Sequence, residues 1–309
     1  PIIVGKTDGL TPSKYKGRGL VALDHVYEFQ TAYCKNTADM QEYLRTFCGQ
    51  LSARSTSAAK RIPVLPKTVD FAYVQNSING FRSVPVGVGK KSLSILSVDL
   101  QSKVIFPVAA QEMYEMIPFA EELVRVISAV KPAIIVDAER ALSSELKECA
   151  AFVAGNYESF VQSLFGEMVL RNNTYKDAML DPDSLTSFEE RTYVIVGMKR
   201  LLDQLTPDGK DKLSTLLEKA EAIYKLHFVV VETAAGYKDC AYGGWYKRHL
   251  NGADGVWIGD GIADQYFLKI NKITSELYEE IGSDYGYLVS RNRPIRIKTL
   301  SRESAEEGM

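Results

Sequence analysis

The sequence predicts an α/β protein with a mostly parallel, doubly wound sheet flanked by helices. Several short segments are continuous apolar runs rich in Val and Ile, which is typical of strands buried on both faces of a parallel sheet. Helical segments lie between most of these runs, and such alternation indicates a doubly wound sheet. The predicted strands are 93–100, 103–109, 133–138, 192–198, 227–233 and 255–259.

Three segments between the strands have helical periodicity: 118–130, roughly 156–180 and 210–226. In the second, one stripe is predicted to face the core. This stripe consists of Phe160, Leu164, Phe165 and Met168. In the third, the apolar face consists of Leu213, Leu216, Leu217, Ala220 and Tyr224.

Both ends of the chain read as β-hairpins. Apolar residues flank a polar turn in 17–31 and again in 285–300. The first hairpin is followed by apolar residues at helical spacing, with Asn36 or Thr37 as the expected N-cap. The apolar residues are Met40, Tyr43, Leu44, Phe47 and Leu51. A polar stretch with two prolines then predicts a linker.

The composition excludes several classes of protein. The 309 residues carry a formal net charge of −2, which gives no broad attraction to nucleic acid or to an anionic membrane. The four cysteines form no CxxC pair and the three histidines are dispersed, so no metal site is expected. No apolar run is long enough to span a bilayer, and no signal peptide precedes the first strand. Because the chain opens on proline within a patterned segment, we expect a piece of a longer protein.

Two segments look like parts of a nucleotide site but lack its pattern. In "VPVGVGKKSL" (84–93), a Walker A loop would need glycines where Pro85 and Lys90 stand, and a helix where "LSILSVDL" predicts a strand. We therefore expect a turn that enters a strand. Asp137, at the end of the run "AIIVDA", has the setting of a Walker B acid, yet no phosphate loop is evident for a neighbouring strand. Asp137 is expected to be a turn or cap residue.

Several segments, in the same order, resemble the C-terminal part of the FtsK/SpoIIIE-type secretion ATPases. These segments are "GRGLV…VYEFQTAYC", "VPVGVGKKSL", "KVIFPVA", "HFVVVETA", "GVWIGDGIADQYFLKI" and "GYLVSRNRPIRIK". The similarity covers nearly the whole chain and looks strongest to the last (third) ATPase-like domain of a type VIIb secretion coupling protein. The resemblance implies a RecA-like (P-loop NTPase-type) fold. It also implies that 1–34 is the C-terminal tail of the preceding ATPase domain, 35–67 a helix and linker, and 68–309 a degenerate ATPase domain.

The same resemblance places the family's Walker A loop on "FPVAAQEM", where only Pro107 of the consensus survives. Phe106 and Gln111 stand at the glycine positions, Glu112 at the lysine and Met113 at the hydroxyl. A glutamate in place of the lysine opposes phosphate by roughly 4 kcal/mol at about 4 Å and intermediate dielectric, and Met113 offers Mg²⁺ no oxygen. Pro118 favours a first helical turn, so the following helix is expected to begin near it.

The family's Walker B strand corresponds to "TYVIVGM", and its acidic pair would fall at Gly197 and Met198. Neither residue can position Mg²⁺ or water. Two separate motifs thus lack their chemistry. We expect no catalytic or nucleotide-binding residues in this domain, and no hydrolysis, cofactor or metal; ATP and Mg²⁺ would bind the neighbouring domains of the parent protein.

A RecA-like domain without hydrolysis can still bind protein. The resemblance implies recruitment of secreted WXG100- or LXG-type substrates, or regulation of the neighbouring ATPase domains, at the cytoplasmic side of a bacterial membrane. The expected partners are those substrates, the preceding ATPase domain and other copies in a homo-hexamer, but no nucleic acid. Tyr242, Trp245 and Tyr246 are the candidate substrate-binding residues, with packing on the sheet as the alternative for Trp245 and Tyr246; Trp257 is expected in the core. Two other functions stay open: an active ATPase with an atypical nucleotide site, and a DNA-translocase-like motor.

Overall fold

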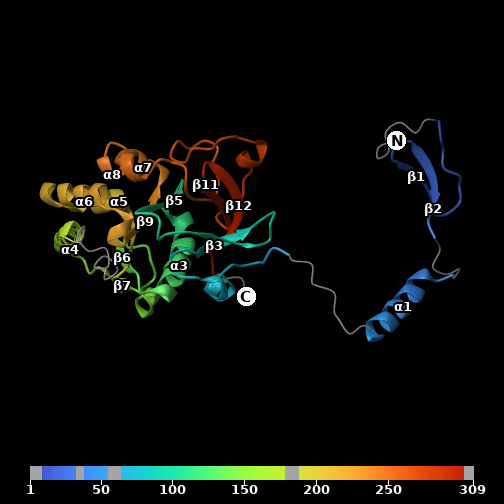
Figure 1. The fold of residues 1–309 in the computed structure, drawn as a ribbon, viewed down its shortest axis with the longest axis horizontal. Coiled ribbons are helices and arrows are strands. Elements are labelled where there is room, and N and C mark those ends of the chain that lie inside the picture. The colour runs from blue at the N-terminus through green and yellow to red at the C-terminus, as the bar shows by residue number, and fades with distance from the viewer. Residues whose placement is uncertain (1–8, 33–37, 55–63, 178–187, 303–309) are drawn as a thin grey trace. The chain divides into compact units, whose positions relative to one another are not determined.

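The computed structural model describes residues 9–32, 38–54, 64–177 and 188–302 (Figure 1). The chain divides into two compact units, Pro1–Ile62 and Pro63–Met309. Among the described residues, no helix has the length and apolarity that a bilayer crossing requires.

In its described residues, the first unit contains a hairpin and one helix. Strands β1 (Arg18–Ala22) and β2 (Val26–Gln30) pair antiparallel, which confirms the hairpin predicted at 17–31. Helix α1 (Met40–Arg54) follows and has no buried residue, and Asp39 accepts a hydrogen bond from the backbone N–H of Glu42 at 2.9 Å. The predicted caps Asn36 and Thr37 lie outside the described residues.

The second unit is built on a ten-stranded sheet with the order β4-β3-β12-β11-β10-β5-β9-β8-β6-β7. Six strands at one side, from β10 to β7, run parallel to one another. Their bounds are β5 (Ile105–Ala110), β6 (Ile134–Asp137), β7 (Ala151–Phe152), β8 (Arg191–Val196), β9 (Leu226–Thr233) and β10 (Gly255–Ile258). Five of these strands are predicted apolar runs, and their burial on both faces confirms the inference drawn from continuous Val and Ile.

The other side of the sheet is an antiparallel extension. It consists of β3 (Val84–Gly89), β4 (Ile95–Val98), β11 (Tyr285–Ser290) and β12 (Arg293–Thr299). The hairpin predicted at 285–300 is confirmed, with Arg291 and Asn292 both at positive φ in its turn. The expectation for 84–93 was incomplete: "VPVGVG" is itself a fully buried strand, and only the segment after Gly89 forms the turn into β4.

Helices cover both faces of this sheet (Figure 1). Helix α3 (Met113–Val130) packs on one face against alternate residues of β5, such as Phe106 and Val108. The opposite face, which includes Ile105 and Ala109, is covered by two longer and three short helices. These are α4 (Tyr157–Asp177), α5 (Met198–Gln204), α6 (Pro207–Lys219), α7 (Ala234–Cys240) and α8 (Gly244–His249).

Two predicted helix boundaries were wrong. Pro118 lies inside α3 and does not begin it, because the helix starts five residues earlier at Met113. The segment 210–226 ends as a helix at Lys219 and continues as a short 3₁₀ turn, Ala222–Tyr224, and β9. The core stripe of α4 is confirmed: Leu164 and Met168 are buried, and Phe160 and Phe165 pack beside them.

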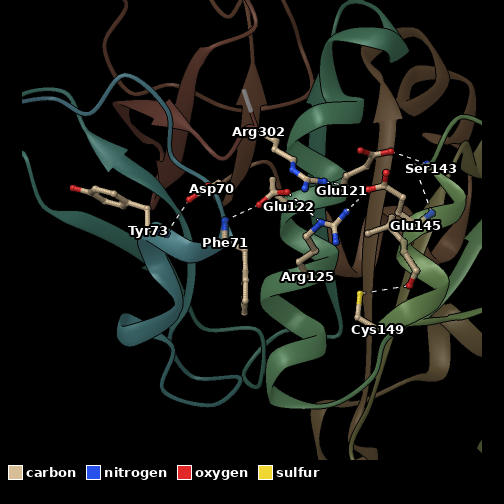
Figure 2. A network of polar contacts seen from close by, with 11 residues as sticks. Asp70, Phe71, Tyr73, Glu121, Glu122, Arg125, Ser143, Glu145, Cys149 and Arg302 are labelled. Atoms are coloured by element: carbon tan, nitrogen blue, oxygen red, sulfur yellow. Dashed lines mark hydrogen bonds and ion pairs between the residues drawn. The ribbon is translucent and has the colours of Figure 1, made fainter. Parts of the chain in front are cut away.

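A polar network joins the start and end of the second unit to α3 (Figure 2). The buried carboxylate of Glu122 accepts a 2.6 Å hydrogen bond from the backbone N–H of Phe71, the first residue of α2 (Phe71–Val74), and pairs with Arg125 at 3.2 Å. Arg125 and Arg302 both lie within ion-pair distance of Glu145. Phe71 is thus bonded directly to α3, and Arg302, more than 200 residues later in the chain, is linked to the same helix through Glu145.

Candidate functional site

The connection between β5 and α3 is too short for a phosphate loop. The strand ends at Ala110 and the helix begins at Met113, so only Gln111 and Glu112 lie between them. A Walker A loop needs several residues in this place to wrap backbone N–H groups around phosphate. Here Phe106 and Pro107, at the start of the corresponding consensus, are buried residues within the strand.

Carboxylates occupy the N-terminus of α3, where phosphate would be bound. Glu112 is the N-cap residue, and its backbone N–H donates to the Glu115 carboxylate at 3.1 Å. The partial positive charge of the helix end is therefore met by side chains of the protein itself. The loop after β10 packs closely against this helix end. A Cβ added at Gly261 would lie 2.7 Å from the side-chain nitrogen of Gln111, and a Cβ added at Gly259 would lie 3.3 Å from a carboxylate oxygen of Glu115.

The end of β8 carries no acidic residue on the strand. Gly197 follows the strand at φ +78°, and Met198 is fully buried as the first residue of α5. The carboxylate of Glu139, from the loop after β6, packs against Gly197, where an added Cβ would lie 2.6 Å from its Cγ. Glu139 is itself paired with Arg200 at 2.9 Å.

Asp137 is a turn-capping residue, as the sequence predicted. Its carboxylate accepts hydrogen bonds from the backbone N–H groups of Ala141 and Leu142, at 3.2 and 2.9 Å. Strand β6 is separated from β5 by β8 and β9, so Asp137 does not lie on a strand adjacent to the β5–α3 connection.

Glu232, which the sequence reasoning did not single out, is a buried carboxylate at the carboxyl end of β9. It accepts from the backbone N–H of Lys199 at 2.9 Å and of Thr233 at 2.8 Å. Burial raises the pKa of Glu232 above its usual value despite these donors, which act in the opposite direction. Its hydrogen bonds join the N-termini of α5 and α7 to the sheet, so its oxygens already have protein partners.

These residues do not fit ATP with Mg²⁺. The β5–α3 connection cannot wrap a triphosphate, Glu112 and Glu115 repel it, and Met198 has no metal-binding oxygen. Within the described part of the chain, His, Cys, Asp and Glu side chains form no group of three or more able to hold a metal ion.

An apolar groove lies at the same edge of the sheet, beside the carboxyl ends of β5, β9 and β10. We call it the carboxyl-edge groove; its volume is about 410 Å³. Carboxyl ends of strands at a switch in winding are where open α/β sheets bind ligands. The groove is lined by Gln111, Ala234, Ala235, Lys238, Ala241, Tyr246, Asp264, Gln265, Tyr266 and Phe267.

Phe267, in the lining of this groove, belongs to a group of packed aromatic rings. The ring of Phe267 stacks on buried Tyr237, with centroids 4.1 Å apart, and lies 6.3 Å from the ring of Tyr246. The Tyr237 hydroxyl donates to the carbonyl oxygen of Val230 at 2.7 Å, inside β9. Tyr266 is 98% exposed at the rim, so it is available to a partner without first leaving a packed position.

The three aromatic residues proposed from sequence have different positions. Tyr246 lines the groove, Trp245 is 2% exposed and packs in the core, and Tyr242 is 87% exposed but does not line the groove. Trp257 is fully buried, as expected. Sequence reasoning missed Tyr266 and Phe267, although both lie in the "GIADQYF" segment that carries the resemblance; no periodicity connects them to 234–246.

No family model and no curated protein matches this chain. Solved structures do match it. One is the cytoplasmic domain of EssC, with a TM-score of 0.64, 13% identity, and coverage of 98% of this chain and 61% of that chain. Another is EssC (ATPases 2 and 3) from Geobacillus thermodenitrificans, with a TM-score of 0.68, 14% identity, and coverage of 98% and 58%.

A third match is Thermomonospora curvata EccC (ATPases 2 and 3) in complex with a signal sequence peptide. Its TM-score is 0.58 at 20% identity, with coverage of 95% of this chain and 54% of that chain. The chain therefore spans less than two thirds of each of these three proteins. At these identities the likeness establishes the fold: a RecA-like sheet flanked by helices, as in the EssC and EccC ATPase domains.

Proposed function

We propose that the chain is an ATPase-like part of an EssC-type secretion coupling protein that does not hydrolyse ATP and that binds a helical segment of an exported protein. The observation that carries the proposal is the carboxyl edge of the sheet. There, only Gln111 and Glu112 connect β5 to α3, where a phosphate loop would need more residues. Gln111 also lines the apolar groove, so the groove lies next to this connection.

The loss of nucleotide chemistry is supported at two places on that edge. Glu112 and Glu115 put negative charge where phosphate would need positive charge. Gly197 and Met198 leave the end of β8 without a carboxylate, and Glu139 fills the space beside it while paired with Arg200. An ATP-hydrolysing site at this edge would require rearrangement both at the N-terminus of α3 and at the end of β8.

The groove favours an amphipathic helix as its ligand. Phe267 lines it together with Ala234, Ala235 and Ala241, whose small side chains let a helix approach closely. Lys238 and Asp264 add one charge of each sign at the lining, so a bound segment is expected to have polar groups beside its apolar face. The related EccC structure contains a signal sequence peptide, which supports peptide binding by a domain of this fold.

The exposed ring of Tyr266 provides the test. Synthetic peptides copied from the C-terminal helices of WXG100- and LXG-type proteins are titrated against the full chain by fluorescence anisotropy. We expect at least one to bind, and Tyr266→Ala to weaken it about tenfold, since hot-spot aromatics contribute roughly 1–2 kcal/mol or more. Tyr278→Ala removes an equally large ring, 61% exposed and outside the groove, and is expected to leave the affinity unchanged.

Nucleotide binding is measured on the same protein with a fluorescent ATP analogue and Mg²⁺. We expect no saturable binding at micromolar concentrations. Micromolar affinity would contradict the proposal and favour an ATPase with an atypical site, whereas failure of every peptide would leave regulation of a neighbouring ATPase domain as the function. DNA binding that disappears at moderate salt would instead favour a translocase-like motor.

A further inference from the structure

A second groove lies on the antiparallel extension of the sheet, formed by segments that the proposed function does not use. We call it the antiparallel-end groove; its volume is about 570 Å³. That volume lies within the roughly 300–1,000 Å³ range of ligand pockets. The groove is lined by Lys90, Lys91, Ser92, Lys272, Thr274, Glu276, Leu277, Glu279, Tyr287, Pro294, Ile295 and Arg296.

The lining is cationic although the chain as a whole is slightly acidic. Four cationic side chains, Lys90, Lys91, Lys272 and Arg296, face two carboxylates, Glu276 and Glu279, which gives a net lining charge of +2. The formal charge of the whole chain is −2. Positive charge is therefore concentrated at this place.

The groove already binds carboxylates from its own wall. Lys91 pairs with Glu276 at 3.0 Å, and Arg296 pairs with Glu279 at 2.5 Å. Within the described ranges, Lys90 and Lys272 make no ion pair, and the Nε of Arg296 has no hydrogen-bond acceptor. Two ammonium groups from separate segments, the β3–β4 turn and the loop before β11, remain available to further carboxylates.

Apolar side chains line the groove between these charges. Ile295 is 42% exposed, and buried Leu277 and Tyr287 lie beside it. The Tyr287 hydroxyl donates to the backbone oxygen of Glu276 at 3.2 Å, which ties this wall to the sheet. A ligand that satisfied the lysines alone would leave Ile295 in water.

We infer that the antiparallel-end groove binds an acidic peptide segment with an apolar residue between its carboxylates. Free phosphate would use the cations but not the apolar lining. Nucleic acid would likewise pair its phosphates with the cations and leave the exposed Ile295 without an apolar partner. A peptide uses both features, because its carboxylates reach Lys90 and Lys272 while its apolar residue covers Ile295.

The test is a titration of the full chain with a fluorescein-labelled Glu-Glu-Leu-Phe-Glu-Glu peptide at low salt. We expect saturable binding that weakens as salt is added, since exposed ion pairs are screened. The double variant Lys90→Glu with Lys272→Glu is expected to bind about tenfold more weakly or worse, a change of about 1.4 kcal/mol in binding free energy. A peptide with Gln in place of every Glu is expected to lose binding similarly.

The matched control reverses two exposed lysines that do not line the groove, Lys147→Glu with Lys247→Glu, and has the same net charge. Equal weakening in the control, or unchanged binding in the groove variant, would overturn the inference. Binding to phosphatidylserine vesicles, inorganic phosphate or ATP but not to the peptide would overturn it too. Tyr266→Ala is expected to have no effect here, so the two grooves can be tested separately.

Discussion

At the scale of single residues, the most informative side chains are carboxylates that neither composition nor motif identified. Glu232 is 4% exposed and Glu122 is 3% exposed, yet each accepts hydrogen bonds from backbone N–H groups of other segments. Burial raises the pKa of both carboxyl groups. Both residues therefore hold elements in place with groups that are costly to bury, which makes them sensitive to substitution and to pH.

Glu232→Gln is expected to change how stability depends on pH. Because the pKa of Glu232 is raised in the folded state, its contribution to stability is fully present below the unfolded value near 4.5 and is lost as the pH rises through the folded value. The glutamine cannot ionise, so the variant does not lose this stability. Its free energy of unfolding should therefore increase relative to that of the wild type as the pH rises. Urea unfolding across the acidic to neutral range measures this difference.

Glu232→Ala is the comparison variant. It leaves the partly buried N–H groups of Lys199 and Thr233 without their acceptor, so we expect a loss of about 1–3 kcal/mol at every pH. A constant gap between Glu232→Gln and the wild type over the whole range would show that Glu232 does not titrate differently in the folded state.

At the scale of elements, helix α8 links the core to the carboxyl-edge groove. Trp245 lies in the core and Tyr246 in the groove, with their rings 6.0 Å apart and nearly perpendicular. Consecutive residues of one helix point in different directions, so neighbours in sequence have different roles. Trp245 is placed to support the groove through packing rather than through contact with a ligand.

Trp245→Ala is expected to destabilise the protein by about 3–5 kcal/mol, because it removes a large buried ring. Tyr242→Ala, three residues earlier and 87% exposed, is expected to change stability by less than about 0.5 kcal/mol. Thermal or urea unfolding distinguishes them. Equal, small effects for both variants would mean that Trp245 is not a core residue.

At the scale of the whole molecule, the two units differ in how they are stabilised. Both hydrophobic clusters, one on each face of the ten-stranded sheet, belong entirely to the second unit. The first unit has a two-stranded hairpin and a helix without a buried residue, and isolated hairpins are marginal in water. The second unit thus holds its own core.

A fragment starting at Pro63 is therefore expected to fold alone. Its free energy of unfolding should match that of the full chain within about 0.5 kcal/mol, since no residue of either cluster is removed. Both tryptophans, Trp245 and Trp257, lie in this fragment, so their fluorescence reports the same transition in both proteins. A fragment that fails to fold, or unfolds much earlier, would show that residues 1–62 contribute to the core.

The sequence by itself determined the class of fold. Continuous Val and Ile runs predicted β5, β6, β8, β9 and β10, because strands buried on both faces need no polar alternation. The placement of Walker positions on the chain rests on the resemblance alone and stays a prediction, since it needs only an alignment of positions. Even the two terminal hairpins follow from local alternation and polar turns.

Only the tertiary structure decided where the surfaces lie. "VPVGVG" became a strand because β12 offers it a pairing edge, and α3 began at Met113 despite Pro118 because the sheet and α2 fix its position. The carboxyl-edge groove joins Gln111 to Phe267, and the antiparallel-end groove joins Lys90 to Lys272. These residues lie far apart in the chain, and the order of strands in the sheet brings them together. A contact of this kind leaves no periodic pattern in the sequence.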